Sequence, residues 1–192
     1  MGALLTLVQS LGVAWAAGVS VYATVAVVGL AAKLGWVDRL PPGLDGVAQW
    51  WVIALAGALY LFEFLATLIP GVASAWETFH SGIRPLAGAA LAAATAWGAD
   101  PALTLVAALL GGTLALGTHA TKLGLRYAID TSPEPVTNGA ANVTELGLVA
   151  TVAIVVWHHP YVALAIALTL LLLGALAARA VWRAIRRLVG RT

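Results

Sequence analysis

The sequence has no cysteine, and only 9% of its 192 residues are charged. The absence of cysteine excludes disulfides, thiolate metal sites, iron–sulfur clusters and cysteine nucleophiles. An average soluble domain is about 25% charged, so the scarcity of charge excludes a water-soluble globule of this size. It also excludes a disordered chain, because disordered segments are polar and rich in charge.

Hydrophobic residues make up 61% of the chain and lie in long runs. A transmembrane helix needs about 20 mostly apolar residues, so the sequence predicts an all-α, polytopic transmembrane helical bundle, a single membrane domain over residues 1–192. We expect six spans and a basic tail, at about 4–34, 50–69, 85–97, 101–121, 144–157, 161–178 and 179–192. The alternative is five spans with one re-entrant segment. The first run is longer than one span requires, and Gly12, Gly18 and Gly29 offer places where it could bend or break.

Basic residues indicate the orientation, because cytoplasmic segments of membrane proteins are rich in Lys and Arg. A cluster of arginines after the last span predicts a cytoplasmic C-terminus, and an even number of spans puts the N-terminus there too. We expect this tail to lie along the anionic inner leaflet, which makes membrane lipids the expected partner and excludes nucleic acid. The arginines are Arg179, Arg183, Arg186, Arg187 and Arg191.

Ionisable residues inside apolar runs are the natural places to look for a site. Glu63 is the deepest of them. Its run has enough apolar residues to insert without functional compensation, so a hydrogen-bonded or ion-paired structural Glu63 and a proton- or cation-handling Glu63 both stay open.

Two polar stripes share the spacing i, i+3, i+7, which puts each stripe on one helix face. Both are expected on the cytoplasmic side, where an acidic residue of one helix could neutralise a basic residue of another. They form either an interfacial belt of ion pairs with snorkelling side chains or a polar vestibule for an anionic or protonatable solute. The stripes are Glu77, His80 and Arg84, and His119, Lys122 and Arg126.

The segment DTSPEPVTNGAANVTE, residues 130–145, is the least lipid-like part of the chain. Pro133 and Pro135 disfavour a regular helix and hold Glu134 in an extended context. Asn142 and Glu145 resemble a capping box that opens a short helix. Such a helix after irregular backbone is typical of broken transporter helices, and a plain cytoplasmic loop is the alternative.

Signatures of metal sites and enzymes are missing from the sequence. His158 and His159 are expected on the outer side, whereas His80 and His119 are expected on the inner side, so the four do not form one site. A metal or haem held by His80 and His119 lacks a ligating carboxylate motif beside it. HExxH, GxSxG and a phosphate-cradling glycine loop with lysine are also absent. We therefore expect no cofactor, no metal and no enzymatic activity.

Three stretches, at Ala16–Gly35, Val52–Ala94 and Gly117–Val149, together resemble an uncharacterised family of small bacterial integral membrane proteins, the domain of unknown function 4126. Their motifs are a Glu before Ile-Pro-Gly-Val, then Ile-Arg-Pro-x-Ala-Gly, then Ser-Pro-Glu-Pro before Asn. The resemblance implies a multi-pass protein of the bacterial inner membrane with no settled activity. By position, the residues that match the family pattern are Glu63, Pro70, Glu77, Arg84, Pro85, Lys122, Arg126, Ser132, Pro133, Glu134, Pro135, Asn138 and Glu145.

The chain departs from this family pattern at four positions. Thr67, Leu68 and Ala73 stand where we expect charged residues around the Ile-Pro-Gly-Val motif, and Leu146 stands where we expect a second acid. If those charges take part in the family's chemistry, this chain binds differently or uses the remaining charges structurally.

Two functions of different classes follow from these observations. The first is a transporter or channel for a small solute or ion, in which intramembrane carboxylates handle protons or cations and a basic cluster attracts an anionic group. The second is an accessory or scaffold subunit of a larger membrane complex, with purely structural ion pairs. The protein partners expected besides lipid are a second copy of the chain, in a homo-oligomer, or the other subunits of such a complex. An enzyme acting on lipid headgroups through His80 and His119 is a third hypothesis. The expected ion- or substrate-binding residues are Glu63, Glu77, His80, Arg84, His119, Lys122, Arg126, Glu134, Asn138 and Glu145.

Overall fold

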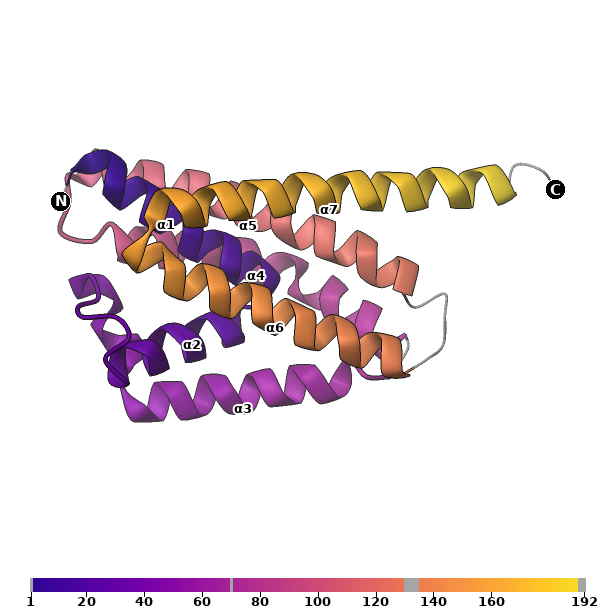
Figure 1. Cartoon of the computed structure of the whole chain (residues 1–192), viewed down its shortest axis with the longest axis horizontal. Coiled ribbons are helices and arrows are strands. Elements are labelled where there is room, and N and C mark those ends of the chain that lie inside the picture. The colour runs from indigo at the N-terminus through magenta and orange to yellow at the C-terminus, as the bar shows by residue number, and fades with distance from the viewer. Residues whose placement is uncertain (1, 70, 130–134, 190–192) are drawn as a thin grey trace.

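The computed structural model describes residues 2–69, 71–129 and 135–189, and over these the chain is all-α. Seven α-helices and one 3-10 helix, η1, form an elongated bundle (Figure 1). The helices are α1 Ala3–Val19, α2 Val21–Lys33, η1 Pro42–Ala48, α3 Trp50–Ala66, α4 Val72–Thr95, α5 Pro101–Ile129, α6 Pro135–His158 and α7 Pro160–Val189.

Three helices are long and apolar enough to cross a membrane, and their qualifying segments are Pro101–Tyr127, Val136–His158 and Pro160–Ala177. A fourth candidate is the pair η1 and α3, which is bent by 70°. The helices α1 and α2 are apolar but shorter. By length and composition the chain therefore has three or four candidate membrane spans among its described residues.

The first apolar run breaks at Ser20 and turns back inside the bundle. Ser20 has an extended backbone, with φ −155° and ψ 115°, and its side chain caps α2 by accepting a hydrogen bond from the backbone N–H of Ala23 at 3.3 Å. α1 runs into the bundle from the end marked N, and α2 returns toward that same end (Figure 1). At 1.5 Å per residue, α1 reaches about 25 Å into the bundle before this break.

Contacts at the outer ends of α1 and α2 agree with this hairpin. Thr6 and Gln9 of α1 line a cavity together with Leu40, which follows α2, and Trp97, which follows α4. Lys33, the last residue of α2, lies over the ring of Trp50 at the start of α3, with 5.9 Å from its Nζ to the ring centroid. The two ends of residues 3–33 thus lie at the same end of the bundle.

Small residues allow α1 to pack deeply against α4 and α5. A Cβ atom on Gly18 would lie 2.6 Å from the carbonyl oxygen of Ala115, and one on Gly111 would lie 2.4 Å from the Cβ of Ala92. Both distances are too short for real atoms, so these positions need glycine. Close backbone approach through small residues is a common way of packing helices in membranes.

The structure corrects several predicted boundaries. The helix predicted from residue 85 begins at Val72 and has Pro85 in its interior. The helix predicted over 144–157 begins at Pro135, in the first turn where proline is tolerated. Asn142 and Glu145 therefore lie inside α6 and form no capping box. These polar residues extend the helices into the bundle because partners on other helices satisfy them, which a hydropathy pattern does not reveal.

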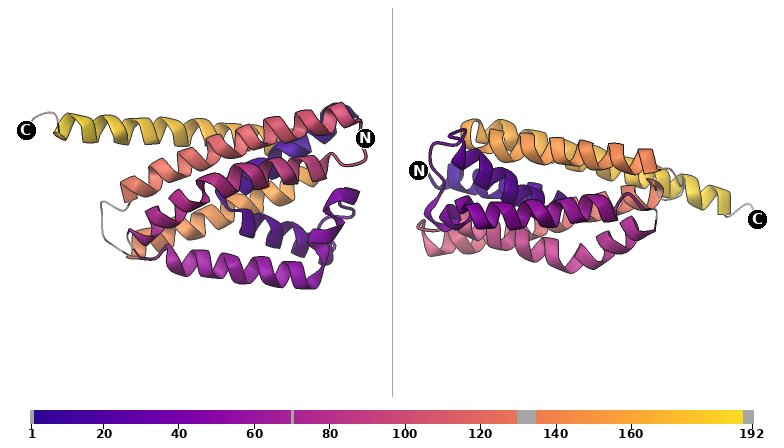
Figure 2. Two further views of the ribbon diagram at one scale, coloured as in Figure 1. Left: turned by 180° about the vertical axis from the view of Figure 1, so that it is seen from behind. Right: turned by 90° about the horizontal axis from the view of Figure 1, so that it is seen from below.

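The N-terminal end of α1 and the C-terminal end of α7 lie at opposite ends of the bundle (Figure 1). The break at Ser20 divides residues 3–33 into a hairpin of two helices. α7 continues as one helix through Arg179, Arg183 and Arg186 and extends beyond the other helices (Figure 2).

Candidate functional site

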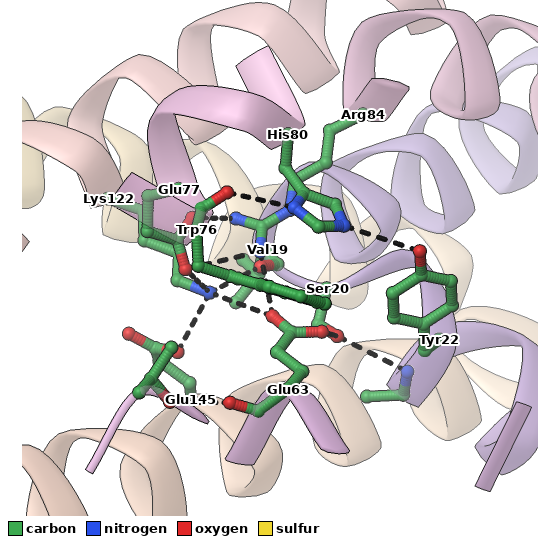
Figure 3. A network of polar contacts seen from close by, with 12 residues as sticks. Val19, Ser20, Tyr22, Glu63, Trp76, Glu77, His80, Arg84, Lys122 and Glu145 are labelled. Carbon is green, nitrogen blue, oxygen red and sulfur yellow. Dashed lines mark hydrogen bonds and ion pairs between the residues drawn. The ribbon is translucent and has the colours of Figure 1, made fainter. Parts of the chain in front are cut away.

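A buried network of ionised side chains lies beside the hairpin tip at Ser20 (Figure 3). It combines three carboxylates with three cations from four helices. Its members are Glu63 on α3, Glu77 and Arg84 on α4, Lys122 and Arg126 on α5, and Glu145 on α6.

Arg84 joins two carboxylates at the α4 side of the network. Its Nη2 donates to Glu63 Oε1 at 2.7 Å and to Glu77 Oε1 at 3.2 Å, and its Nη1 donates to Glu77 Oε2. The Arg84 side chain is 1% exposed. A planar guanidinium with two forward-pointing nitrogens suits this double pairing, which a lysine could not reproduce.

Lys122 connects the two halves of the network. Its Nζ lies 2.8 Å from Glu77 Oε1, 3.0 Å from Glu145 Oε2 and 3.5 Å from Glu63 Oε1. It also donates to the backbone carbonyl of Val19 at 2.9 Å. One ammonium group therefore contacts all three carboxylates of the network and the last residue of α1.

The Lys122 contact is one of two that attach the hairpin tip to the network. In the other, Ser20 Oγ donates to Glu63 Oε2 at 3.0 Å. The break in the helix leaves the Val19 carbonyl free of a normal intrahelical partner, and Lys122 satisfies it. The conformation of the tip is thus held by charged side chains of α3 and α5.

Arg126 and Glu145 form the opposite side of the network. Arg126 donates to Glu145 Oε1 from Nη2 at 2.8 Å and from Nε at 3.1 Å. Its Nη1 donates to Asn138 Oδ1 at 3.4 Å, and its Nη2 donates to Asn142 Oδ1. Asn142 Nδ2 in turn donates to the carbonyl of Phe64 at 3.1 Å, which links α6 to α3.

The two histidines border the network, and the contacts of His119 require a neutral ring. Arg84 can only donate, so its 3.0 Å hydrogen bond to His119 Nδ1 requires an unprotonated nitrogen there. His119 Nε2 then carries the proton and donates to Ser81 Oγ at 2.9 Å. His80 Nδ1 donates to the carbonyl of Trp76 at 2.8 Å, and its Nε2 lies 3.3 Å from the Tyr22 hydroxyl.

Charge is balanced inside the network, with three negative and three positive side chains in mutual contact. An unpaired ion would be costly at this depth, because the idealised penalty for transferring one from water into a low-dielectric interior is of order 20 kcal/mol. Mutual neutralisation removes most of that penalty. It also means that loss or protonation of one member disturbs all the others.

The sequence prediction located most of this network. Nine of the ten predicted site residues are described. Six of them form the network, and His119 and Asn138 contact its members Arg84 and Arg126. His80 lies beside the network and is bound to Tyr22 and Trp76. Glu134, the tenth, lies outside the described residues. Eight of the nine side chains are buried inside the bundle, and Glu145 is 22% exposed. The nine are Glu63, Glu77, His80, Arg84, His119, Lys122, Arg126, Asn138 and Glu145.

The sequence reasoning missed the hairpin tip and read Asn142 as a cap. Ser20 carried a usable signal, because it is a good N-cap residue inside an otherwise apolar run. Thr67, noted only as a departure from the family pattern, donates from Oγ1 to Asn142 Oδ1 at 3.1 Å. Its hydroxyl therefore takes part in the polar contacts around Arg126.

Metal binding has no support from this geometry. Among the residues that the structure describes, no group of three or more His, Asp or Glu side chains is placed to hold a metal ion. The acidic groups near one another are instead occupied by lysine and arginine.

Comparison with known families agrees with the resemblance seen in the sequence. Residues 7–180 match the family described as "Domain of unknown function (DUF4126)". The chain belongs to this family. The match includes the whole ion network and the hairpin tip, so both lie within the DUF4126 domain. Neither a curated protein nor a solved structure matches the chain significantly.

Proposed function

We propose that this DUF4126 protein is a transporter or channel for a small solute or ion, with its buried carboxylates carrying protons. The observation that carries this proposal is the attachment of the hairpin tip to the ion network, through Ser20 to Glu63 and through Val19 to Lys122. Broken helices whose ends meet charged groups inside the bilayer form the substrate and ion sites of many transporters.

The proposed mechanism follows from the shared charge balance. Protonation of Glu63 would weaken its ion pair with Arg84 and its acceptance of the Ser20 hydrogen bond. Lys122 would then have two ionised carboxylates as partners instead of three, while its ammonium group still donates to the Val19 carbonyl. A proton on the network is thereby coupled to the position of the hairpin tip, and movement of the tip would open the network to one side of the membrane.

In the proposed topology the four candidate spans cross the membrane together with α4, which packs along α5, and α1 with α2 enter and leave on one side. Arg84, Lys122 and Arg126 are buried in the network and so do not count among loop charges. The arginines at the end of α7 then place the C-terminus in the cytoplasm and the N-terminus outside. Exposed aromatic residues at the outer end fit a membrane interface, namely Trp36, Trp50, Trp51, Trp97 and Tyr161. Arg179, Arg183 and Arg186, beyond the bundle, would contact anionic lipid headgroups.

Proton flux into proteoliposomes tests this function. A lumenal pH dye reports flux driven by a potassium diffusion potential, with empty liposomes as the baseline. We expect flux above this baseline for the parent and none for the double variant Glu63→Gln, Lys122→Met, whose remaining four charges still form two pairs. The matched control is Asp38→Asn, Lys33→Met, which removes one exposed charge of each sign and should keep the parental flux.

Parental flux equal to that of empty liposomes contradicts the proposal. Flux of the network double variant equal to that of the parent removes Glu63 and Lys122 from the mechanism.

The second function, an accessory subunit of a membrane complex, is favoured by the balance of three carboxylates against three cations within the network. A network whose charges satisfy one another can serve to fix helix positions alone. Gentle detergent extraction followed by native mass measurement separates the two functions. A complex with a second, stoichiometric protein favours the accessory role, whereas a homo-oligomer or monomer that conducts protons favours the transporter.

A further inference from the structure

A cavity of about 350 Å³ lies between α1, α5, α6 and α7, beside the ion network. This volume is within the range of small-molecule sites. Most of its lining is apolar, and much of it comes from leucines of α5, α6 and α7, with Trp15 of α1. Lys122 and Glu145 also line it, so the cavity joins an apolar chamber to the charged network.

The cavity opens toward the lipid side of the bundle. Leu173 of α7 lines it and is 56% exposed, and Ala177 lines it and is also exposed. An occupant would therefore come from the bilayer rather than from water. At roughly 30 Å³ per non-hydrogen atom, close to the share of a water molecule in the liquid, the cavity holds about ten to twelve atoms.

The hydrogen-bonding groups at the polar end of the cavity, Lys122 and Glu145, restrict which polar headgroup a bound molecule can have. Lys122 has three N–H donors, and four oxygens already lie within 3.5 Å of its Nζ. It has no donor left. Glu145 is 22% exposed, the largest exposed fraction in the network, and its Oε2 lies 3.0 Å from Lys122 Nζ. A carboxylate oxygen has two lone pairs, so Glu145 can accept one more hydrogen bond.

The zero net charge of the ion network restricts the charge of this headgroup. The network is already neutral, so a charged head of either sign would leave it unbalanced in a low-dielectric environment. An anionic head would also face the Glu145 carboxylate. A neutral head that donates a hydrogen bond avoids both penalties.

We propose that this cavity binds a single-chain lipophilic alcohol, with its hydroxyl donating to Glu145 and its chain among the leucines. This site is independent of transport. It would bind the alcohol whether or not the network moves protons.

Photo-crosslinking tests the site on the full-length protein in liposomes. The probe is a nine-carbon primary alcohol with a diazirine near the chain end, and peptide mass spectrometry locates the crosslinks. We expect crosslinks concentrated on cavity-lining residues of α6 and α7, and at least tenfold competition by excess nonan-1-ol. Probes of equal length with a carboxylate or an ammonium head should label these residues at least fivefold less.

Two variants of α7 make the test specific. Ala177→Trp fills the cavity and should reduce cavity crosslinks at least tenfold. Ala175→Trp adds the same side chain at an exposed position that does not line the cavity, and labelling should stay at the parental level.

Three results would overturn the proposal. They are equal labelling in both tryptophan variants, stronger labelling by either charged probe, and labelling spread evenly over the lipid-facing helices. Equal cavity labelling by a phosphatidylcholine with a diazirine acyl chain would show that ordinary bilayer lipid fills the cavity, and this also contradicts a site for an alcohol.

Discussion

Charge balance in the network can be tested by removing Lys122 and Glu63 separately and together. Lys122→Met leaves three buried carboxylates with two cations, and Glu63→Gln leaves two carboxylates with three cations. Each single variant therefore has one uncompensated charge. The double variant keeps two complete pairs, Arg84 with Glu77 and Arg126 with Glu145.

The expected magnitude follows from the burial of these groups. Breaking a buried ion pair by removing one partner costs about 3–5 kcal/mol. For a chain of this length, about 2–4 °C of melting temperature corresponds to 1 kcal/mol, so each single variant should melt about 6–20 °C below the parent. In the double variant, the loss should be smaller than the sum of the two single losses by at least about 1 kcal/mol, within the range seen for directly coupled residues.

Thermal unfolding of purified protein in one mild detergent, at one scan rate, measures these differences. The control pair is Lys33→Met and Asp38→Asn, both at exposed positions, whose effects should be small and additive. Losses for Lys122 and Glu63 that add within about 0.5 kcal/mol would show that the two sites are independent. That result would refute a network with shared charge balance.

Three further variants test the packing and the tip by the same unfolding measurement. Gly111→Leu should lower the melting temperature by at least about 2 °C, because overpacking costs about 1–3 kcal/mol, whereas Gly57→Leu, which has open space around it, should not. Ser20→Ala should lose about 1.5–3 kcal/mol, the usual value of a hydrogen bond to a charged group, and no loss would contradict the attachment of the tip. Arg84→Lys should lose at least about 1.5 kcal/mol, since an ammonium group has no second nitrogen with which to bind both oxygens of Glu77 as Arg84 does; parental stability would show that the guanidinium shape is unimportant.

The composition of the chain predicted its class and most of the network, because charges are rare in apolar helices and tend to find one another. The spacing of Glu77 with Arg84 and of Lys122 with Arg126 indicated faces that could meet, and the structure brings them together. The family motifs pointed to the same residues. These predictions depended on local spacing, which the sequence displays directly.

The remaining features depend on contacts between distant segments. Ser20 becomes a turning point because Glu63 and Lys122, far away in the sequence, bind the tip at that depth. Similarly, the local sequence predicts that Asn142 caps a helix, whereas in the structure its side chain binds Arg126 and the carbonyl of Phe64. Hydropathy alone therefore did not show the break at Ser20 and placed the starts of α4 and α6 too late in the sequence.

The proposed transport function requires that residues 3–33 enter and leave the bilayer on one side. Because the chain has no cysteine, single cysteines at Ala3, Lys33 and Arg183 can be labelled in intact cells with a membrane-impermeant maleimide, and again after permeabilisation. We predict that Ala3→Cys and Lys33→Cys label in intact cells and that Arg183→Cys labels only after permeabilisation. Labelling of Ala3→Cys and Lys33→Cys from opposite sides would contradict the hairpin and the function built on it.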